Sequence, residues 1–364
     1  MQQTISNKHY KTQLNKKIDA LKAAFKTAGL IIPEPQIYQS PIEHFRMRAE
    51  FRIWHKGERS FYAMHHPDTK EIYTLEQFPI ASKTICECMP VLIEAINNNE
   101  QLSRKAFQVE FLSSTTDQLL VSLIYHRPLD DDWIEQAKQL ETQLNAHLIG
   151  RSRKQKIIVS QDYVIEKMTI NNKTYSYQQT ENSFTQPNAA VCQHMLQWAC
   201  DRVKQIDSGG DLLELYCGNG NFTLPLSTIF NDVLATEVSK TSVRSAQYNV
   251  DINNIENVRI VRLSSEETVQ ALNRERTFTR LKEIQLDDYQ FSTVFVDPPR
   301  AGLDSTTLEL VKRFENIIYI SCNPETFINN VQQLNDYTIK SFAAFDQFPY
   351  TNHLEVGAIL KRTS

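Results

Sequence analysis

A cysteine and a glutamate near the C-terminal end of the chain could together supply a nucleophile and a second catalytic group. Cys322 stands in YISCNPETF, where a predicted strand gives way to a helix that begins near Glu325. A helix N-terminus lowers the pKa of a nearby thiol, so we expect Cys322 to act as a nucleophile. Glu355, in DQFPYTNHLEVG, is the candidate for the second group. We expect the remaining cysteines to be small buried apolar side chains: Cys86, Cys88, Cys192, Cys200 and Cys217.

Two further motifs predict a nucleoside-binding site. LLELYCGNGNF contains a Gly-x-Gly turn after a buried strand, and Glu237 follows nineteen residues after Gly218, where an acid can bind the two hydroxyls of a ribose. FVDPPRAGL puts Asp297 at a strand end and Arg300 on a rigid turn. The acid alone does not separate NAD from S-adenosylmethionine. Thr223 occupies the position of the third glycine of NAD sites, which favours a ligand without a pyrophosphate.

The second half of the chain alternates strands and helices, which predicts a mostly parallel sheet with helices on both faces. The expected strands are 211–216, 232–237, 258–262, 292–296 and 317–321. The expected helices are 189–204, 222–229, 240–253, 306–314 and 325–334. No helix separates 338–345 from 354–361, so this last pair is expected to be an antiparallel hairpin.

The first half reads as an α+β region with an antiparallel sheet. The expected helices are 7–28, 83–96 and 131–145, and the expected strands are 44–55, 60–64, 107–112 and 119–126. Strand 44–55 alternates strictly, so Phe45, Met47, Ala49, Phe51 and Ile53 share one face. The pattern of strands and helices changes near SFTQPN, so we expect two domains, one over 1–182 and one over 183–364.

Two groups of cations could hold nucleic-acid phosphates. Arg46, Arg48 and Arg52 are expected on the exposed face of strand 44–55. The second group is Arg151, Arg153, Lys154 and Lys156. A solvated charged face is the alternative for either group. The formal net charge of -4 and the pI near 6.2 argue mildly against nucleic-acid binding, so local arrangement has to carry the case.

The bulk properties are those of a soluble protein of about two domains. The chain has 364 residues, and no run approaches the roughly 20 apolar residues of a membrane helix. The N-terminal segment MQQTISNKHYKTQLNKK lacks the apolar core of a secretory signal. The six cysteines have no framework spacing, so we expect a reducing, cytoplasmic location.

Five segments of the second half together resemble the RNA uracil-C5 methyltransferases: SFTQPN, LLELYCGNGNF, VFVDPPRAGL, SCNPETF and DQFPYTNHLEVG. SPIEHFRMRAEFRIWH and HLIGRSRK resemble the bacterial tRNA branch, whose members make ribothymidine at uridine 54 of the T-loop and also act on tmRNA. Ribosomal-RNA members carry a TRAM β-barrel and a four-cysteine iron–sulfur cluster. A helical N-terminus and a single close cysteine pair favour the tRNA branch.

The resemblance implies a Rossmann-like class I methyltransferase domain preceded by an α+β RNA-binding domain, with no metal and no iron–sulfur cluster. It implies Cys322 as nucleophile, Glu355 as proton acceptor and Arg300 at the target base. It assigns S-adenosylmethionine to Gln186, Tyr216, Asn221, Glu237 and Asp297, and the T-arm to Phe107 and His126. Three alternatives stay open: a ribosomal-RNA methyltransferase without a cluster, a nucleotide-dependent oxidoreductase, and a non-catalytic tRNA-folding chaperone.

Overall fold

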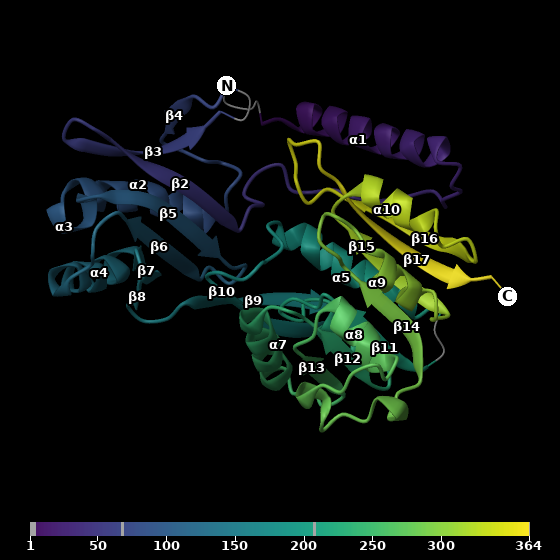
Figure 1. Cartoon of the computed structure of the whole chain (residues 1–364). Coiled ribbons are helices and arrows are strands. Elements are labelled where there is room, and N and C mark those ends of the chain that lie inside the picture. Colours follow the sequence, from purple (N-terminus) through teal and green to yellow (C-terminus); the bar gives the residue numbers. More distant parts are fainter. Residues whose placement is uncertain (1–4, 67–68, 207–208, 364) are drawn as a thin grey trace. The chain divides into compact units, whose positions relative to one another are not determined.

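The computed structural model describes residues 5–66, 69–206 and 209–363, which divide into two units (Figure 1). Unit 1 comprises Met1–Ile42, Met168–Gln178 and Ala190–Ser364, and unit 2 comprises Glu43–Lys167 and Gln179–Ala189. This division differs from the expected boundary after residue 182. Periodicity alone does not report long-range contacts. Two early segments contact later residues of unit 1: one through strand pairing, and the other through hydrogen bonds from Ser176 and Gln178 to Asn253 and Asn249.

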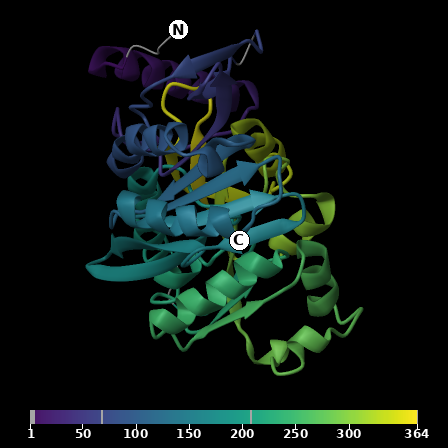
Figure 2. The same cartoon turned by 90° about the vertical axis from the view of Figure 1, so that its left-hand side faces the viewer.

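The first of these segments holds helix α1 (Asn7–Thr27) and strand β1 (Gln36–Tyr38). β1 pairs with β16 in parallel, in the register Gln36–Ala343 to Tyr38–Phe345. Both views place α1, in purple, beside the yellow C-terminal segment (Figure 1, Figure 2). The second segment is the tip of the hairpin of β9 (Tyr163–Ile170) and β10 (Lys173–Thr180), which the sequence did not predict.

An eight-stranded sheet of order β1-β16-β17-β15-β14-β11-β12-β13 forms the centre of unit 1. Its further strands are β11 (Asp211–Leu215), β12 (Val233–Thr236), β13 (Val258–Val261), β14 (Phe291–Val296), β15 (Asn316–Ser321), β16 (Tyr337–Phe345) and β17 (Glu355–Arg362). β11 to β15 pair in parallel, whereas β17 runs antiparallel to both β15 and β16. The predicted parallel sheet with a terminal antiparallel hairpin is therefore confirmed.

Helices cover this sheet, as the wholly buried residues of β11, β12 and β15 require. After α1 they are α5 (Ala189–Val203), α6 (Thr223–Leu226), α7 (Lys240–Ile252), α8 (Ser265–Leu272), α9 (Ser305–Val311) and α10 (Pro324–Val331). α6 is shorter than the helix expected over 222–229. The N–H of Ile229 donates to the carbonyl of Leu226, three residues back, so the last turn tightens and leaves the α-helical pattern.

Unit 2 is built on a seven-stranded sheet of order β4-β3-β2-β5-β6-β7-β8. Its strands are β2 (Arg48–Lys56), β3 (Arg59–His65), β4 (Ile72–Leu75), β5 (Ala106–Ser113), β6 (Leu119–Tyr125), β7 (His147–Ser152) and β8 (Gln155–Ile158). All pairs are antiparallel except β6 with β7. Its helices are α2 (Lys83–Asn97), α3 (Glu100–Ser103) and α4 (Asp131–Leu144). Apolar residues of the sheet and of these helices share one core.

Candidate active site and RNA-binding surface

The strand order of unit 1 reverses between β11 and β14, and open α/β sheets bind ligands beyond the carboxyl ends of their strands at such a point. Tyr216 and Gly218 follow β11 with positive φ angles of 61° and 57°, so the chain turns sharply there. The N–H of Gly218 donates to Oε2 of Glu237 over 3.0 Å, and the N–H of Ser239 donates to Oε1 over 2.7 Å. These two bonds fix the predicted ribose-binding acid beside the glycine turn.

Two acids beside this turn are held in strongly desolvating surroundings. Burial raises the pKa of Asp297, directly after β14, to about 7. Burial, with the charge of Asp297 as a smaller cause, raises the pKa of Glu214 in β11 to about 8. Within the described part of the chain, neither carboxylate oxygen of Glu214 has a hydrogen-bond partner of normal geometry, and the nearby Thr223 hydroxyl lowers the pKa only in part. Glu214 was not among the predicted site residues, although an acid inside the apolar run LLELY is a signal for such a role.

Cys322 lies half-buried between the end of β15 and the start of α10. Burial raises the pKa of its thiol, the charges of Glu355 and Asp297 raise it further, and Arg300 lowers it. The expectation of a lowered thiol pKa is therefore wrong for the protein without ligands. A short helix does not outweigh desolvation and two nearby acids, and Asn323 already caps its first turn by accepting from the N–H of Glu325.

Glu355 is the first residue of β17 and is 3% exposed. Burial raises its pKa well above the ordinary value, and the charge of Asp297 adds to the rise. The register explains why it meets Cys322, since Ser321 of β15 pairs with Val356 of β17 in antiparallel fashion. The residue after Ser321 and the residue before Val356 therefore face each other at the edge of the sheet.

Arg300 is exposed on the loop after β14. Its backbone carbonyl accepts from Asn323 Nδ2 (3.1 Å) and Thr326 Oγ1 (3.3 Å), which ties the loop to the start of α10. Its guanidinium Nη2 lies 3.3 Å from Nδ1 of His353. Cys322, Glu355, Asp297 and Arg300 thus form one electrostatically connected group in unit 1.

The remaining predicted cofactor residues divide between the two units. Tyr216 and Asn221 belong to unit 1, where the carbonyl of Asn221 accepts from the Tyr177 hydroxyl (3.1 Å) and its Nδ2 lies 3.2 Å from the Cys192 sulfur. Gln186 belongs to unit 2, in a segment where the Pro187 carbonyl accepts from the N–H of Met47. The glycine-turn residues, Asp297 and the catalytic candidates therefore all belong to unit 1, whereas Gln186 belongs to unit 2.

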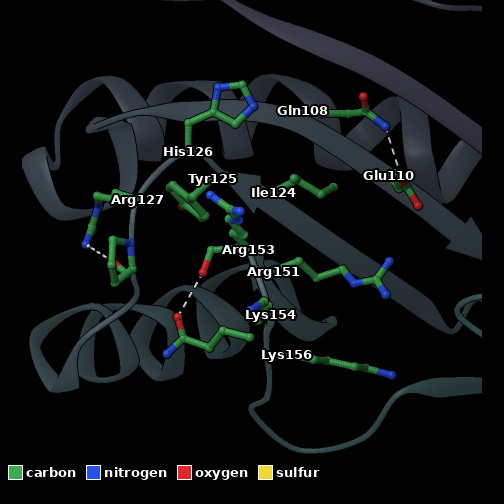
Figure 3. A pocket seen from close by; sticks show the side chains of 13 residues that line it. Gln108, Glu110, Ile124, Tyr125, His126, Arg127, Arg151, Arg153, Lys154 and Lys156 are labelled. Carbon is green, nitrogen blue, oxygen red and sulfur yellow. Dashed lines mark hydrogen bonds between the residues drawn. The ribbon is translucent and has the colours of Figure 1, made fainter.

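In unit 2, three predicted RNA-binding residues form a stack. The rings of Phe107 and His126 lie 3.9 Å apart at 26°, and the guanidinium carbon of Arg52 lies 3.9 Å from the centre of the Phe107 ring. Adjacent to it is an open pocket of about 1080 Å³ (Figure 3). The predicted residues that line it are His126, Arg151, Arg153, Lys154 and Lys156.

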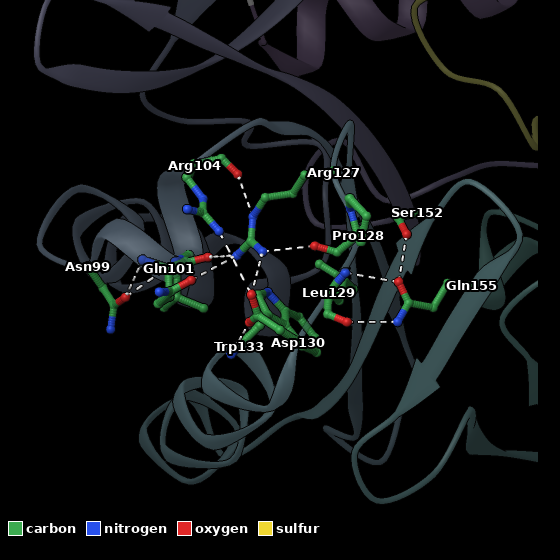
Figure 4. Close-up of polar contacts among 11 residues, drawn as sticks. Asn99, Gln101, Arg104, Arg127, Pro128, Leu129, Asp130, Trp133, Ser152 and Gln155 are labelled. Carbon is green, nitrogen blue, oxygen red and sulfur yellow. Dashed lines mark hydrogen bonds and ion pairs between the residues drawn. The ribbon is translucent and has the colours of Figure 1, made fainter.

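The cationic side chains of this pocket differ in the ion pairs and hydrogen bonds that they form within the protein. Arg151 and Lys156 both reach Glu181, over 3.5 Å and 3.0 Å. Arg127 is fixed by donating to three carbonyls, those of Gln101, Arg104 and Pro128, and its side chain is 8% exposed (Figure 4). Arg153 and Lys154, in the turn between β7 and β8, form no ion pair within the described chain. This turn is itself anchored, because Gln155 exchanges two hydrogen bonds with the backbone of Leu129 (Figure 4).

Arg46 and Arg48 do not lie on a solvent-exposed face, which corrects the expectation for strand 44–55. The strand begins only at Arg48, and both guanidinium groups, like that of Arg52, belong to half-buried residues. Burial lowers the pKa of both Arg46 and Arg48. Arg46 donates to the carbonyl of Arg48, and Arg48 donates to the carbonyls of Thr180 and Ser183. Their hydrogen bonds therefore stabilise unit 2 itself.

Two kinds of feature are absent from the described residues. No group of three or more His, Cys, Asp or Glu side chains there is arranged to hold a metal ion. No helix within residues 5–66, 69–206 and 209–363 is long and apolar enough to cross a membrane. Four of the other cysteines are buried as expected, whereas Cys86 is half-buried beside the carbonyls of Phe78 and Ala81.

The fold and the site define a Rossmann-like class I methyltransferase. Residues 9–363 match the sequence profile of the family tRNA (Uracil-5-)-methyltransferase, and the chain belongs to this family. It is 54% identical over 358 residues to the tRNA/tmRNA (uracil-C(5))-methyltransferase of Cellvibrio japonicus, covering 98% of this chain and 97% of that one. It is 52% identical over 360 residues to the protein of the same name from Neisseria meningitidis, covering 97% of both.

A solved structure shares the fold. The Pyrococcus abyssi tRNA (uracil-54, C5)-methyltransferase in complex with S-adenosyl-L-homocysteine superposes with a TM-score of 0.70 and 22% identity, over 96% of this chain and 83% of that one. At this identity the likeness shows the fold alone, which agrees with the topology of the eight-stranded sheet.

Proposed function

We propose that this protein methylates C5 of the T-loop uridine at position 54 of tRNA, and of the equivalent uridine of tmRNA, through a covalent bond between Cys322 and C6 of the base. Membership of the family and the names of relatives at 50% identity and above support the reaction and the substrates. The observation that carries the proposal is the group of Cys322, Glu355, Asp297 and Arg300, whose charges act on one thiol at the carboxyl edge of the sheet.

The residues fit a cofactor that is a positively charged nucleoside. Glu237 is fixed at the glycine turn for a ribose, and a cation would stabilise the charges of the buried Glu214 and the half-buried Asp297, whose pKa values are both raised. We assign S-adenosylmethionine to five residues: Gln186, Tyr216, Asn221, Glu237 and Asp297. When bound, S-adenosylmethionine supplies an electrophilic methyl group.

The chain's own residues supply the remaining chemistry. The Cys322 thiolate adds to C6 of uracil, and the ring electrons move onto O4, which makes C5 nucleophilic enough to take the methyl group. The Arg300 guanidinium, held on its loop by Asn323 and Thr326, is suited to stabilise the enolate oxygen. The Glu355 carboxylate then takes the C5 proton, the C5=C6 bond re-forms and the thiolate leaves. The electron pair of the broken bond to the methyl group would stay on the sulfur of the donor, the C5 proton ends on Glu355 and the Cys322 thiolate is regenerated, so the reaction balances without a metal or an iron–sulfur cluster.

Unit 2 is proposed to bind the T-arm. A stacked and paired uridine must be flipped out before an enzyme can reach C6, and unstacked RNA bases bind on aromatic and guanidinium planes. The stack of Arg52, Phe107 and His126 provides such planes. Arg153 and Lys154 are the better phosphate contacts, with Arg151 and Lys156 behind them, because the latter pair already shares Glu181. A tRNA substrate implies a cytoplasmic enzyme.

Methyl transfer to defined RNAs tests this proposal. Unmodified tRNA transcripts should gain one methyl group, which mass mapping locates at uridine 54, whereas a transcript with cytidine at that position and ribosomal-RNA fragments should gain none. RNA containing 5-fluorouridine should form an adduct that survives denaturation, since fluorine does not leave as a cation. Cys322→Ala should form no adduct and no product while binding tRNA as the unmodified enzyme does. Methylation of ribosomal RNA, or turnover by Cys322→Ala, would contradict the assignment.

A further inference from the structure

A lysine of helix α1 joins three points of the loop that leads into Glu355. This loop, Asp346–His353, connects β16 to β17 and is called here the 346–353 loop. Nζ of Lys17 donates to Oδ1 of Asp346 over 2.7 Å, and to the carbonyls of Phe348 and His353 over 2.9 Å each. An ammonium group has three N–H donors, so every donor of Lys17 is used within this one loop. One atom therefore links its beginning, middle and end.

The ion pair at the start of this loop is fully enclosed. The side chains of Lys17 and Asp346 are 5% and 0% exposed. Burial lowers the pKa of Lys17, and the charge of Asp346 opposes that fall. A surface ion pair contributes little, but removing one partner of a buried pair leaves an uncompensated charge, so this contact constrains the conformation strongly.

Other residues of the N-terminal segment hold the same loop. Gln13 donates to the carbonyl of Thr351 over 3.1 Å and accepts from the N–H of Tyr350 over 2.7 Å. The Tyr350 hydroxyl donates to the carbonyl of Ile42 over 2.9 Å. Tyr350 has a positive φ of 65°, a conformation that residues with a side chain adopt only when surrounding contacts support it. The shape of the 346–353 loop is thus imposed by α1 and the segment after it.

Glu355 depends on this loop because little else fixes its side chain. It is the first residue of β17, and towards β15 the ladder ends at the pair of Ser321 and Val356, one residue further on. Its buried Oε2 accepts no hydrogen bond from the described residues. Its backbone pairs with Phe345, the last residue before the same loop. The position of the carboxylate is therefore set by packing and by the path of the chain through the 346–353 loop.

We propose that Lys17 is a positioning residue for proton removal by Glu355, so that helix α1 belongs to the catalytic machinery. The inference rests on the proposed function, in which Glu355 is the base. Without Lys17 the loop loses all three ties and Asp346 is left as a buried unpaired charge. A base displaced by about 1 Å slows its step up to about a hundredfold, while the steps that precede proton removal are unaffected.

The test compares Lys17→Met and Lys17→Arg with a matched control on the same helix. Lys22→Met removes a lysine whose ion pair to Glu34 is exposed. In single turnovers with tRNA and radiolabelled S-adenosylmethionine, Lys17→Met should accumulate a covalent, already methylated complex whose decay is about tenfold slower than normal. Lys17→Arg should recover part of the decay rate, and Lys22→Met all of it. With 5-fluorouridine RNA, where proton removal plays no part, Lys17→Met should form its adduct within about twofold of the normal rate.

Two results would overturn the inference. Normal decay of the methylated complex in folded Lys17→Met would exclude a positioning role, and slow formation of the 5-fluorouridine adduct would instead place the effect on Arg300 through His353. If Lys17→Met does not fold, the double variant Lys17→Met with Asp346→Asn removes both charges together and is measured in the same way.

Glu355→Gln separates this inference from the proposed function. If that variant releases product normally, Glu355 is not the base and the proposed function fails at this step. Hydrogen exchange then tests separately whether Lys17 fixes the 346–353 loop. The amides of residues 347–355 should exchange faster in Lys17→Met than in Lys22→Met. Equal exchange in the two variants would refute the link between α1 and this loop.

Discussion

Replacing Glu214 with glutamine should make the free protein more stable, and increasingly so as the pH rises. Glu214 is 1% exposed, its carboxylate oxygens accept no hydrogen bond of normal geometry from residues 5–66, 69–206 and 209–363, and its pKa is raised from 4.5 to about 8. The folded chain therefore keeps a proton that the unfolded chain has already released above pH 4.5. Because the folded state binds more protons, stability falls as the pH rises from the unfolded to the folded pKa.

The magnitude follows from the size of the shift. At about 1.4 kcal/mol per pH unit, retaining the Glu214 proton costs about 2 kcal/mol at pH 6 and about 4 kcal/mol at pH 8, where the folded group is itself half ionised. Glutamine has nearly the same shape and does not titrate, so Glu214→Gln removes this cost. The free energy of unfolding of the variant, relative to the unmodified protein, should therefore grow by about 2 kcal/mol between pH 6 and pH 8.

Urea denaturation followed by circular dichroism at pH 6, 7 and 8 measures this difference. Glu256→Gln is the matched control, since Glu256 is an exposed acid of the same unit and should give a difference that does not change with pH. If Glu214→Gln and the unmodified protein lose stability in parallel between pH 6 and pH 8, then Glu214 is not protonated at neutral pH. The desolvation argument for the cofactor site would then fail with it.

Three further outcomes are expected. Glu355→Gln should accumulate a covalent, already methylated enzyme–RNA complex on denaturing gels. A trapped complex that lacks the new methyl group would contradict the role of Glu355 after methyl transfer. Because burial raises the Glu355 pKa, product release by the unmodified enzyme should become faster as the pH rises. The double variant Arg153→Ala with Lys154→Ala should weaken tRNA binding and flatten its salt dependence by about two units of slope; an unchanged slope would place the RNA elsewhere. Arg48→Ala should lower the free energy of unfolding by about 2–3 kcal/mol, because the hydrogen bonds of Arg48 to two backbone carbonyls are lost. Weaker RNA binding with unchanged stability would instead indicate that Arg48 contacts the RNA.

Much of unit 1 was predictable because its signals are local. Buried strands such as LLEL and VFV, each followed by turn residues and an amphipathic helix, predict a parallel sheet. The absence of a helical pattern after residue 345 predicts the terminal hairpin. The candidate site residues follow from the same alternation of strands and helices, since parallel strands all end at one edge of the sheet. Cys322, Asp297 and Glu237 could therefore be grouped from their positions at strand ends.

What could not be predicted depends on contacts between distant residues. Arg46 and Arg48 occupy alternate positions of a regular strand pattern, and nothing local tells that Thr180 and Ser183 supply carbonyls to one of them. The thiol pKa of Cys322 was misjudged because its dominant causes are burial and two acids, one of which is 33 residues away along the chain. Lys17 reads as one more cation of an amphipathic helix until Asp346 is found beside it.

The antiparallel direction of β17 is a requirement of the chemistry as well as a property of the fold. The carboxyl ends of β11, β12, β14 and β15 meet at one edge, where Cys322 and the proposed cofactor residues of unit 1 lie. A base is useful only if it reaches the adduct formed there. β17 begins with Glu355, and because it runs against β15, its first residue comes to the edge where β15 ends. Had β17 run parallel to β15, its first residue would lie at the opposite edge, about 20 Å away for strands of this length. In the proposed mechanism, the reversal of this one strand, with α1 fixing the loop before it, is thus what would bring the nucleophile Cys322 from a strand end and the base Glu355 from a strand start to the same carbon–carbon bond.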